Sequence, residues 1–395
     1  MRYSMWAYPW DLQDLGLKTT YDEYHNKAGV NSISLAVSYH AGRFLQPRSP
    51  HRKSYFPQDG TIYFTPEQNR WDDQEIKPLV ADNLHEKGDM LSALIKDRQK
   101  HGLAVSCWTV CLHNTRLGMQ HPDHVTRNAF GDPSFYSLCP SSPAARSYVT
   151  TLIADLTHNY RPDMVELETT GFMGFDHGYH HEKDGIGLTP EDTFLLSLCF
   201  CDHCTQTAAR NGVDALSAQK LVKELIESAC SRDIPSPIFP NFPEDGIATF
   251  KDLPALYDYL KWRSQPVTSL LESIKNAAHP DSKILLIEGE NAWRDGFDLK
   301  AVGKVCDGMI LCAYSANPKM ITETVKRTRE KLGESNYLGF GASAFYEHTQ
   351  SSDDLRQRIQ AAITAGADGI NFYNYGLIPE PRLKWIKASI EDSQA

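Results

Sequence analysis

Two pairs of glutamates follow apolar runs and are the residues of this sequence best placed to act as acids and bases. Glu166 and Glu168 alternate with apolar residues in MVELE, and Glu288 and Glu290 follow ILLI. A period of two places Glu166 and Glu168 on one face of a strand. Two carboxyl groups flanking a glycosidic bond are the minimal apparatus for its hydrolysis. We therefore predict Glu168 as the general acid/base and Glu288 as the nucleophile or base.

Aromatic, amide and imidazole side chains stand near the ends of the other predicted strands. Such a set suits a carbohydrate, whose hydroxyls form hydrogen bonds and whose apolar ring faces stack on aromatic rings. The tryptophans would supply stacking surfaces, and the polar groups would bind hydroxyls or an acidic group. The predicted substrate-binding residues are Trp6, Trp10, His40, Trp108, His113, Asn114, His177, His180, His181, Glu290, Tyr314 and Asn374.

The segment GFDHGYHHEKDG carries three histidines within five positions, His177, His180 and His181. Imidazoles beside carboxylates suit zinc or another divalent ion, which is one interpretation. The other is that these histidines give hydrogen bonds and charge to a substrate. The spacing H-x-x-H-H-E differs from the helical H-E-x-x-H of zinc peptidases, so peptidase chemistry is not expected.

Three cysteines within six positions, Cys199, Cys201 and Cys204, form C-F-C-D-H-C. A fourth ligand could close a tetrahedral zinc site with them, and such a closed site would be structural because it leaves no open position. The alternative is a set of reduced thiols on a packed segment. The candidates for the fourth ligand are His203, Cys139 and Cys230.

The elements that must position these residues alternate between strand and helix. Apolar, β-branched runs bounded by turn formers predict the strands, and helical patterns separate them. Among the helices, one is predicted at 11–28, one at 144–158 after Ser141, Ser142 and Pro143, and one at 318–332. Eight such repeats predict a closed (β/α)8 TIM barrel, in which catalytic groups lie at the carboxyl ends of the strands. An open doubly wound sheet is the rival architecture. The predicted strands cover residues 3–8, 31–39, 103–112, 164–168, 284–287, 308–313, 337–341 and 369–373.

Two segments are longer than a simple barrel connection. Residues 41–88 form a polar, proline-containing stretch, and loops of this length are usually functional or disordered. An excursion at about 171–280 follows the fourth strand and contains helices, the last predicted at 253–278. We interpret the whole chain, 1–395, as one barrel domain with long βα loops and this helical insertion.

Composition restricts the partners. The formal net charge is −10 in 395 residues and no basic stripe is visible, which argues against nucleic acid. No apolar run approaches the roughly 20 residues that cross a bilayer, and the start of the chain lacks a signal-peptide pattern, so no membrane partner and a cytoplasmic location are expected. Nine cysteines then indicate reduced thiols or a metal site. A small carbohydrate is the expected partner, and homo-oligomerisation is left open.

The sequence also resembles a known group of proteins. An L-C-P-x-x-P turn with a following arginine, an acidic end to the fourth strand and a later C-F-C-x-x-C resemble the glycosyl-hydrolase barrels of many bacterial genomes. Cys139, Cys199, Cys201 and Cys204 resemble the group that binds structural zinc in glycoside hydrolase family 42. This chain departs from those barrels after Glu168, where Thr169 and Thr170 replace an Asp-Tyr-Arg sequence.

The resemblance implies a glycosidase acting on a small saccharide or glycoside. Glu168 and Glu288 match barrel glycosidases that take their carboxylates from strands four and five, and no cofactor is then required for catalysis. A metal-dependent sugar isomerase, epimerase or lyase is the first alternative, with an ion held by both glutamates and the loop histidines. A non-catalytic sugar-binding barrel is the second.

Overall fold

Eight parallel strands close into a barrel in the computed structural model, which describes residues 1–178 and 181–394. Each strand pairs with the next, and β1 pairs with both β14 and β2, which closes the cylinder. The predicted (β/α)8 barrel is confirmed, and the open doubly wound sheet is excluded. The strands are β1 (Arg2–Ala7), β2 (Ser32–Tyr39), β7 (Ala104–Val110), β10 (Met164–Glu168), β11 (Lys283–Glu288), β12 (Gly308–Cys312), β13 (Tyr337–Ser343) and β14 (Gly369–Tyr373).

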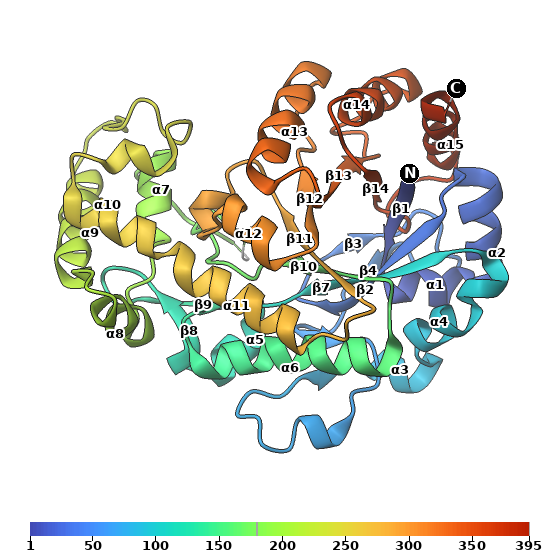
Figure 1. Ribbon diagram of the computed structural model, residues 1–395, viewed down its shortest axis with the longest axis horizontal. Coiled ribbons are helices and arrows are strands. Elements are labelled where there is room, and N and C mark those ends of the chain that lie inside the picture. Colours follow the sequence, from blue (N-terminus) through green and yellow to red (C-terminus); the bar gives the residue numbers. More distant parts are fainter. Residues whose placement is uncertain (179–180, 395) are drawn as a thin grey trace.

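Helices pack around the outside of the barrel (Figure 1). Their apolar faces cover strands that are buried on both sides, as expected for a parallel sheet. None of the helices in the described part of the chain has the length and hydrophobicity that a bilayer crossing requires. The outer helices are α4 (Met90–His101), α6 (Pro143–Tyr160), α11 (Ser264–Ala277), α12 (Leu299–Val305), α13 (Pro318–Leu332), α14 (Ser352–Thr364) and α15 (Pro381–Gln394).

Capping residues fix where several helices begin. The Ser142 hydroxyl accepts a hydrogen bond from the Ala145 N–H at 3.4 Å, and Pro143 occupies the first turn of α6. Asn317 caps α13 in the same way, ahead of Pro318. Proline is well suited to a first turn because its missing N–H would have no partner there. These starts lie where the sequence predicted them, within one residue.

Two predicted helices are broken in the structure. The first, expected over residues 11–28, is divided at Gly16 (φ +80°) into α1 (Pro9–Leu15) and α2 (Leu17–Asp22), followed by a π-helical turn (Glu23–Ala28). The second, expected over 253–278, is divided at Arg263 into α10 (Pro254–Trp262) and α11. Pro266 has no N–H to donate to the preceding turn, which accounts for the second break.

The excursion after β10 forms a group of helices at one side of the barrel (Figure 1). Helix α11 lies in the segment predicted as an insertion, but it packs between α6 and α12 as one of the outer helices. The helices of the excursion are α7 (Pro190–Leu196), α8 (Asp202–Arg210), α9 (Ala215–Cys230) and α10, joined through a 3₁₀ turn (Gly246–Phe250).

Two connections near the carboxyl ends of the strands carry short elements of their own. Residues 41–88 contain a hairpin of β3 and β4, and β5 extends the sheet by pairing with β2. A second hairpin follows β7. The elements are β3 (Phe44–Leu45), β4 (Ser54–Tyr55), β5 (Thr61–Ile62), a 3₁₀ turn (Gln68–Arg70), β6 (Leu79–Val80), α3 (Asp82–Lys87), α5 (Thr115–Gln120), a 3₁₀ turn (Pro122–His124), β8 (Val125–Arg127) and β9 (Pro133–Leu138).

Candidate active site

A cavity of about 380 Å³ opens at the carboxyl ends of the barrel strands. This is the end at which (β/α)8 enzymes place their catalytic groups. Its lining combines three carboxyl groups with aromatic rings, the pattern expected of a pocket for a small polar ligand with apolar faces. The carboxyl groups are Glu168, Glu288 and Asp295, and the rings are Trp6, Tyr39, Trp108, Phe172, His177, Phe297, Tyr314 and Tyr373.

Glu166 lies in the barrel interior, two residues before Glu168 on the same face of β10. Its carboxylate accepts hydrogen bonds from Trp6 Nε1 (2.8 Å), Ser34 Oγ (2.6 Å) and Asn371 Nδ2 (3.3 Å). Buried carboxylates are tolerated when their oxygens are satisfied in this way. Neutral donors therefore satisfy the Glu166 carboxylate. The hydrogen bond from the Trp6 indole to this carboxylate in turn fixes Trp6 in the cavity wall.

Glu168 is positioned by the end of β10 and by a strained residue after it. The Trp108 indole donates a hydrogen bond to the Glu168 carboxylate, and burial raises the pKa of Glu168 against this bond. Thr169 adopts φ +57°, which costs a β-branched residue on the order of 1–3 kcal/mol. Its carbonyl is held by the Leu112 N–H at 3.0 Å, so the neighbouring strand enforces this geometry.

Glu288 and Asp295 form a second acidic group on the neighbouring strand and loop. Burial raises the pKa of Glu288 well above its usual value and Asp295 raises it further, while the Gly289 N–H at 2.7 Å opposes the rise. Burial raises the pKa of Asp295 to about 7, opposed by Arg263 and Arg294. Like charges in one buried site disfavour ionisation of both groups, so the pair of Glu288 and Asp295 tends to keep a proton.

Asp295 was not predicted from the sequence. It lies in a 3₁₀ turn (Ala292–Asp295), and the stretch NAWRDG carries no strand or helix periodicity that would point its carboxylate at the cavity. Glu290, the predicted binding residue in this loop, faces the other way. Its carboxylate pairs with Arg327 and accepts from Thr324 Oγ1 at 3.2 Å, outside the cavity lining.

Three further predicted binding residues have structural positions instead. Trp10 has no exposed surface and stacks on Tyr8, with ring centroids 4.5 Å apart. Asn114 caps α5: its Oδ1 accepts from the Leu117 N–H at 2.9 Å and its Nδ2 donates to the Gly60 carbonyl at 3.2 Å. Asn374 is fully buried and outside the lining. These residues were predicted because they lie near the ends of predicted strands, but neighbouring segments cover their side chains.

Histidines lie at one wall of the cavity. His177 lines it, and His113 lies behind, with its ring centroid 4.4 Å from that of His177 and 3.8 Å from that of His40. Burial and the neighbouring His177 lower the pKa of His40 to about 3, and burial likewise lowers the pKa of His113. These two imidazoles are therefore neutral near pH 7. His181 is exposed, and His180 lies outside the described residues.

The acids and histidines of the cavity do not form a compact ligand set. Within residues 1–178 and 181–394, only the four cysteines form a group of three or more His, Cys, Asp or Glu whose ligand atoms all lie within 4.8 Å of one another. Glu168, Glu288 and His177 share the cavity lining without meeting this condition.

Cys139 joins Cys199, Cys201 and Cys204 in a buried cluster. The Sγ atom of Cys139 lies 3.9, 3.6 and 3.5 Å from those of the other three cysteines. Four thiolates around Zn²⁺, with Zn–S bonds of about 2.3 Å, have sulfurs about 3.8 Å apart, so the cluster fits a tetrahedral ion. Of the other predicted ligands, Cys230 is exposed and His203 stacks on His124.

The buried Asp295 carboxyl group should destabilise the folded protein above neutral pH, where it becomes ionised. A pKa raised in the folded state favours folding fully below the unfolded-state pKa, and this contribution is lost as pH rises through about 7. Asp295→Asn should therefore be more stable than wild type at pH 8, on the order of 1–2 kcal/mol, and similar at pH 4.5. Urea unfolding at the two pH values measures this. A difference that does not change with pH would contradict it.

Comparison with known proteins agrees with the fold. No family model matches the sequence, and no curated protein matches it significantly. Among solved structures, an α-L-fucosidase isoenzyme from Paenibacillus thiaminolyticus matches at 12% identity and a TM-score of 0.57, covering 100% of this chain and 50% of the fucosidase. The C-terminal domain of a protein assigned as a chitinase from Desulfitobacterium hafniense matches at 8% and 0.51, covering 100% and 99%.

A methyltransferase from Methanosarcina mazei is also similar, at 11% identity and a TM-score of 0.47, covering 98% of this chain and 88% of that one. This chain spans half the length of the fucosidase. At these identities the similarity shows a shared barrel fold. Activity is a separate question, which depends on the residues of the cavity.

Proposed function

We propose that this protein is a glycoside hydrolase and that Glu168 and Glu288 are its catalytic pair. The observation that carries the proposal is the convergence of two carboxyl groups from neighbouring strands, β10 and β11, on one aromatic-walled cavity at the catalytic end of the barrel. The solved glycosidases with a similar fold make this chemistry a natural one for the scaffold.

The charges around the two glutamates favour roles opposite to those predicted from the sequence. Glu288 shares a buried site with Asp295, which keeps a proton on the pair, and this suits a general acid. Burial raises the pKa of Glu168 less than that of Glu288, because the Trp108 N–H donates to the Glu168 carboxylate and stabilises its ionised form, which suits a nucleophile or base. In this scheme Glu288 protonates the departing glycosidic oxygen while Glu168 acts at the anomeric carbon, directly or through water.

The rate should depend on the proton held by Glu288 and Asp295. As pH rises the pair loses this proton, so kcat/KM should fall on the alkaline side. Asp295→Asn removes the negative charge beside Glu288, lowers the pKa of Glu288, and should move the alkaline limb to lower pH. A pH–rate profile of both proteins measures the shift. An alkaline limb that stays in place would contradict the pairing.

The decisive experiment is a panel of aryl glycosides and neutral oligosaccharides, assayed with wild type and with Glu168→Gln. Turnover that Glu168→Gln abolishes supports hydrolysis by this pair. Binding of saccharides without any turnover would instead identify a non-catalytic sugar-binding barrel. Turnover that EDTA removes and manganese restores, while the melting temperature and the metal content of the cysteine cluster stay unchanged, would overturn the mechanism in favour of a metal-dependent one.

We also propose that the four-cysteine cluster holds a structural zinc ion. Two backbone N–H groups point at its sulfurs, from Ser141 to Cys139 and from Arg127 to Cys199, each at 3.4 Å. Such donors stabilise thiolates, the form that binds metal. With four protein ligands the ion would have no open position and would take no part in the reaction.

A further inference from the structure

A second cavity of about 470 Å³ adjoins the catalytic one at His177. We propose that it binds an additional, uncharged sugar unit, so that the substrate is an oligosaccharide or extended glycoside rather than a monosaccharide. This inference rests on the proposed function and names the substrate class of the same site. Each cavity alone lies toward the lower end of the roughly 300–1,000 Å³ typical of ligand pockets, and together they accommodate a longer ligand.

The same short segment, residues 174–177, contributes to the linings of both cavities. Gly174 lines the first cavity, Phe175 and Asp176 line the second, and His177 lines both. Tyr136, a lining residue of the second cavity, donates a hydrogen bond to the Gly174 carbonyl at 3.1 Å. The two cavities therefore share His177 and meet along residues 174–177, and the proposed ligand extends from the first cavity past His177 into the second.

The second cavity also lies close to the catalytic acids. Arg294, which precedes Asp295, forms an ion pair with Asp176 at 3.3 Å. The loop that carries Asp295 and the loop that lines the second cavity are thus joined directly. A sugar unit in the second cavity would therefore contact the loop that is joined to the one carrying Asp295.

Aromatic rings give the second cavity a surface suited to a sugar. Phe135, Tyr136 and Phe175 line it, and the Phe175 side chain is 46% exposed. The C–H face of a pyranose packs on such rings, while its hydroxyls reach the polar groups around them. A sugar stacked on the exposed Phe175 ring would cover part of its apolar surface.

The charges of the lining exclude anionic sugars. Asp176, Glu182 and Asp184 face the second cavity against a single cation, Lys183, among its lining residues. Asp184 accepts backbone N–H bonds from Ile186, Gly187 and Leu188, which hold its pKa low and keep it ionised. A uronic acid, sulfated or phosphorylated unit would be repelled, and a neutral hexose would not.

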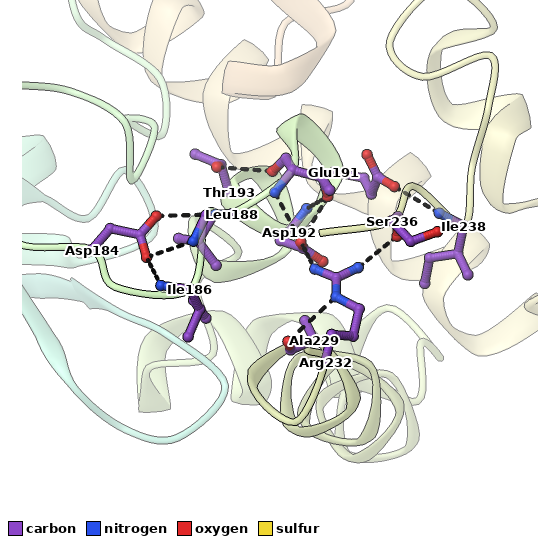
Figure 2. Close-up of polar contacts among 12 residues, drawn as sticks. Asp184, Ile186, Leu188, Glu191, Asp192, Thr193, Ala229, Arg232, Ser236 and Ile238 are labelled. Atoms are coloured by element: carbon purple, nitrogen blue, oxygen red, sulfur yellow. Dashed lines mark hydrogen bonds and ion pairs between the residues drawn. The ribbon is translucent and has the colours of Figure 1, made fainter. Parts of the chain in front are cut away.

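Polar contacts order the segment that carries Asp184, Leu188 and Thr193, three lining residues of the second cavity (Figure 2). The Asp184 bonds shape the turn that leads to Leu188, and α7 begins with a capping box between Thr189 and Asp192. The Asp192 carboxylate is almost fully buried and pairs with Arg232, which follows α9. A wall that is already ordered loses little entropy when a ligand binds, which favours a true binding site.

The test compares substrates of different length on wild type, Phe175→Ala and a matched control, Phe130→Ala. Phe130 is similarly exposed (40%) and lines neither cavity. The substrates are the best p-nitrophenyl monoglycoside of the panel, its aryl diglycoside, and neutral oligosaccharides of two to five units with the same terminal sugar. Wild type should prefer an extended substrate by tenfold or more in kcat/KM, and Phe175→Ala should reduce that ratio about tenfold.

Equal kcat/KM for short and extended substrates, or an equal loss in Phe130→Ala, would overturn the proposal. Preference for a uronic-acid extension over a neutral one would overturn its charge argument. Isothermal titration of the neutral oligosaccharides and their monosaccharide separates this proposal from the proposed function. If no glycoside is hydrolysed, tighter oligosaccharide binding that Phe175→Ala weakens still supports the second cavity, and equal binding of both ligands overturns it.

Discussion

Glu168→Gln is expected to lower kcat/KM on the best glycoside by at least about 10²- to 10⁴-fold, the range contributed by one acid/base group. The amide has the shape of the carboxyl group, and its oxygen can still accept the Trp108 N–H, so the fold should be retained. What it loses is the negative charge needed at the anomeric carbon. Steady-state kinetics measure the effect, and an unchanged melting temperature checks that the fold is retained.

Substrate choice then separates the roles of the two glutamates. If Glu288 is the acid, Glu288→Gln should remain active on dinitrophenyl glycosides, whose leaving group needs no proton, and fail on alkyl glycosides and oligosaccharides. Glu168→Gln should fail on all of them. Glu290→Gln is the matched control, because this neighbouring carboxylate pairs with Arg327 outside the cavity. Equal loss in Glu290→Gln, or full activity of Glu168→Gln, would contradict the proposed pair.

Cys204→Ser is expected to lower the melting temperature by ten degrees or more and to abolish bound zinc, with one ion per chain in wild type. A structural zinc ion contributes its binding energy directly to folding, and the cluster connects the start of α6 to the excursion near α8. Metal analysis after dialysis and thermal unfolding with and without chelator make the measurement.

A buried serine could destabilise the protein even without a metal, so metal content is the discriminating readout. The matched control is Cys230→Ser, because Cys230 is exposed and lies outside the cluster. If a zinc ion holds the four thiols, a second substitution, Cys199→Ser, should add little to the loss caused by Cys204→Ser. Wild-type protein without metal, or additive effects of the two substitutions, would contradict the zinc site.

Features with a local physical cause were predictable from the sequence. The alternation in MVELE placed Glu166 and Glu168 on one face of β10, and the structure shows both directed inward, at different heights. Ser142 and Pro143 marked the start of α6 because capping depends on adjacent residues. Eight strand–helix repeats were enough to identify the barrel, because strands buried on both faces have a distinctive composition.

Features set by contacts between distant segments were not predictable. Asp295 reaches the cavity because a 3₁₀ turn brings it near Arg263. Glu290 lies outside the cavity because its carboxylate pairs with Arg327 on α13. Asn114 and Trp10 follow predicted strands but are covered by residues 41–88. In the cysteine cluster, the spacing identified three members and the family resemblance indicated Cys139 as the fourth, which the fold brings next to them.

The left-handed turn at Thr169 has a consequence for how this protein can evolve. The carbonyl groups of Glu168 and Thr169 accept hydrogen bonds from the Cys111 and Leu112 N–H groups, directly after β7, before the chain enters the excursion. Insertions or deletions beyond Gly171 would therefore alter the walls around a ligand without displacing the catalytic carboxylate. The barrel can keep its reactive groups while the adjoining loop diversifies, which lets selection change the ligand separately from the chemistry.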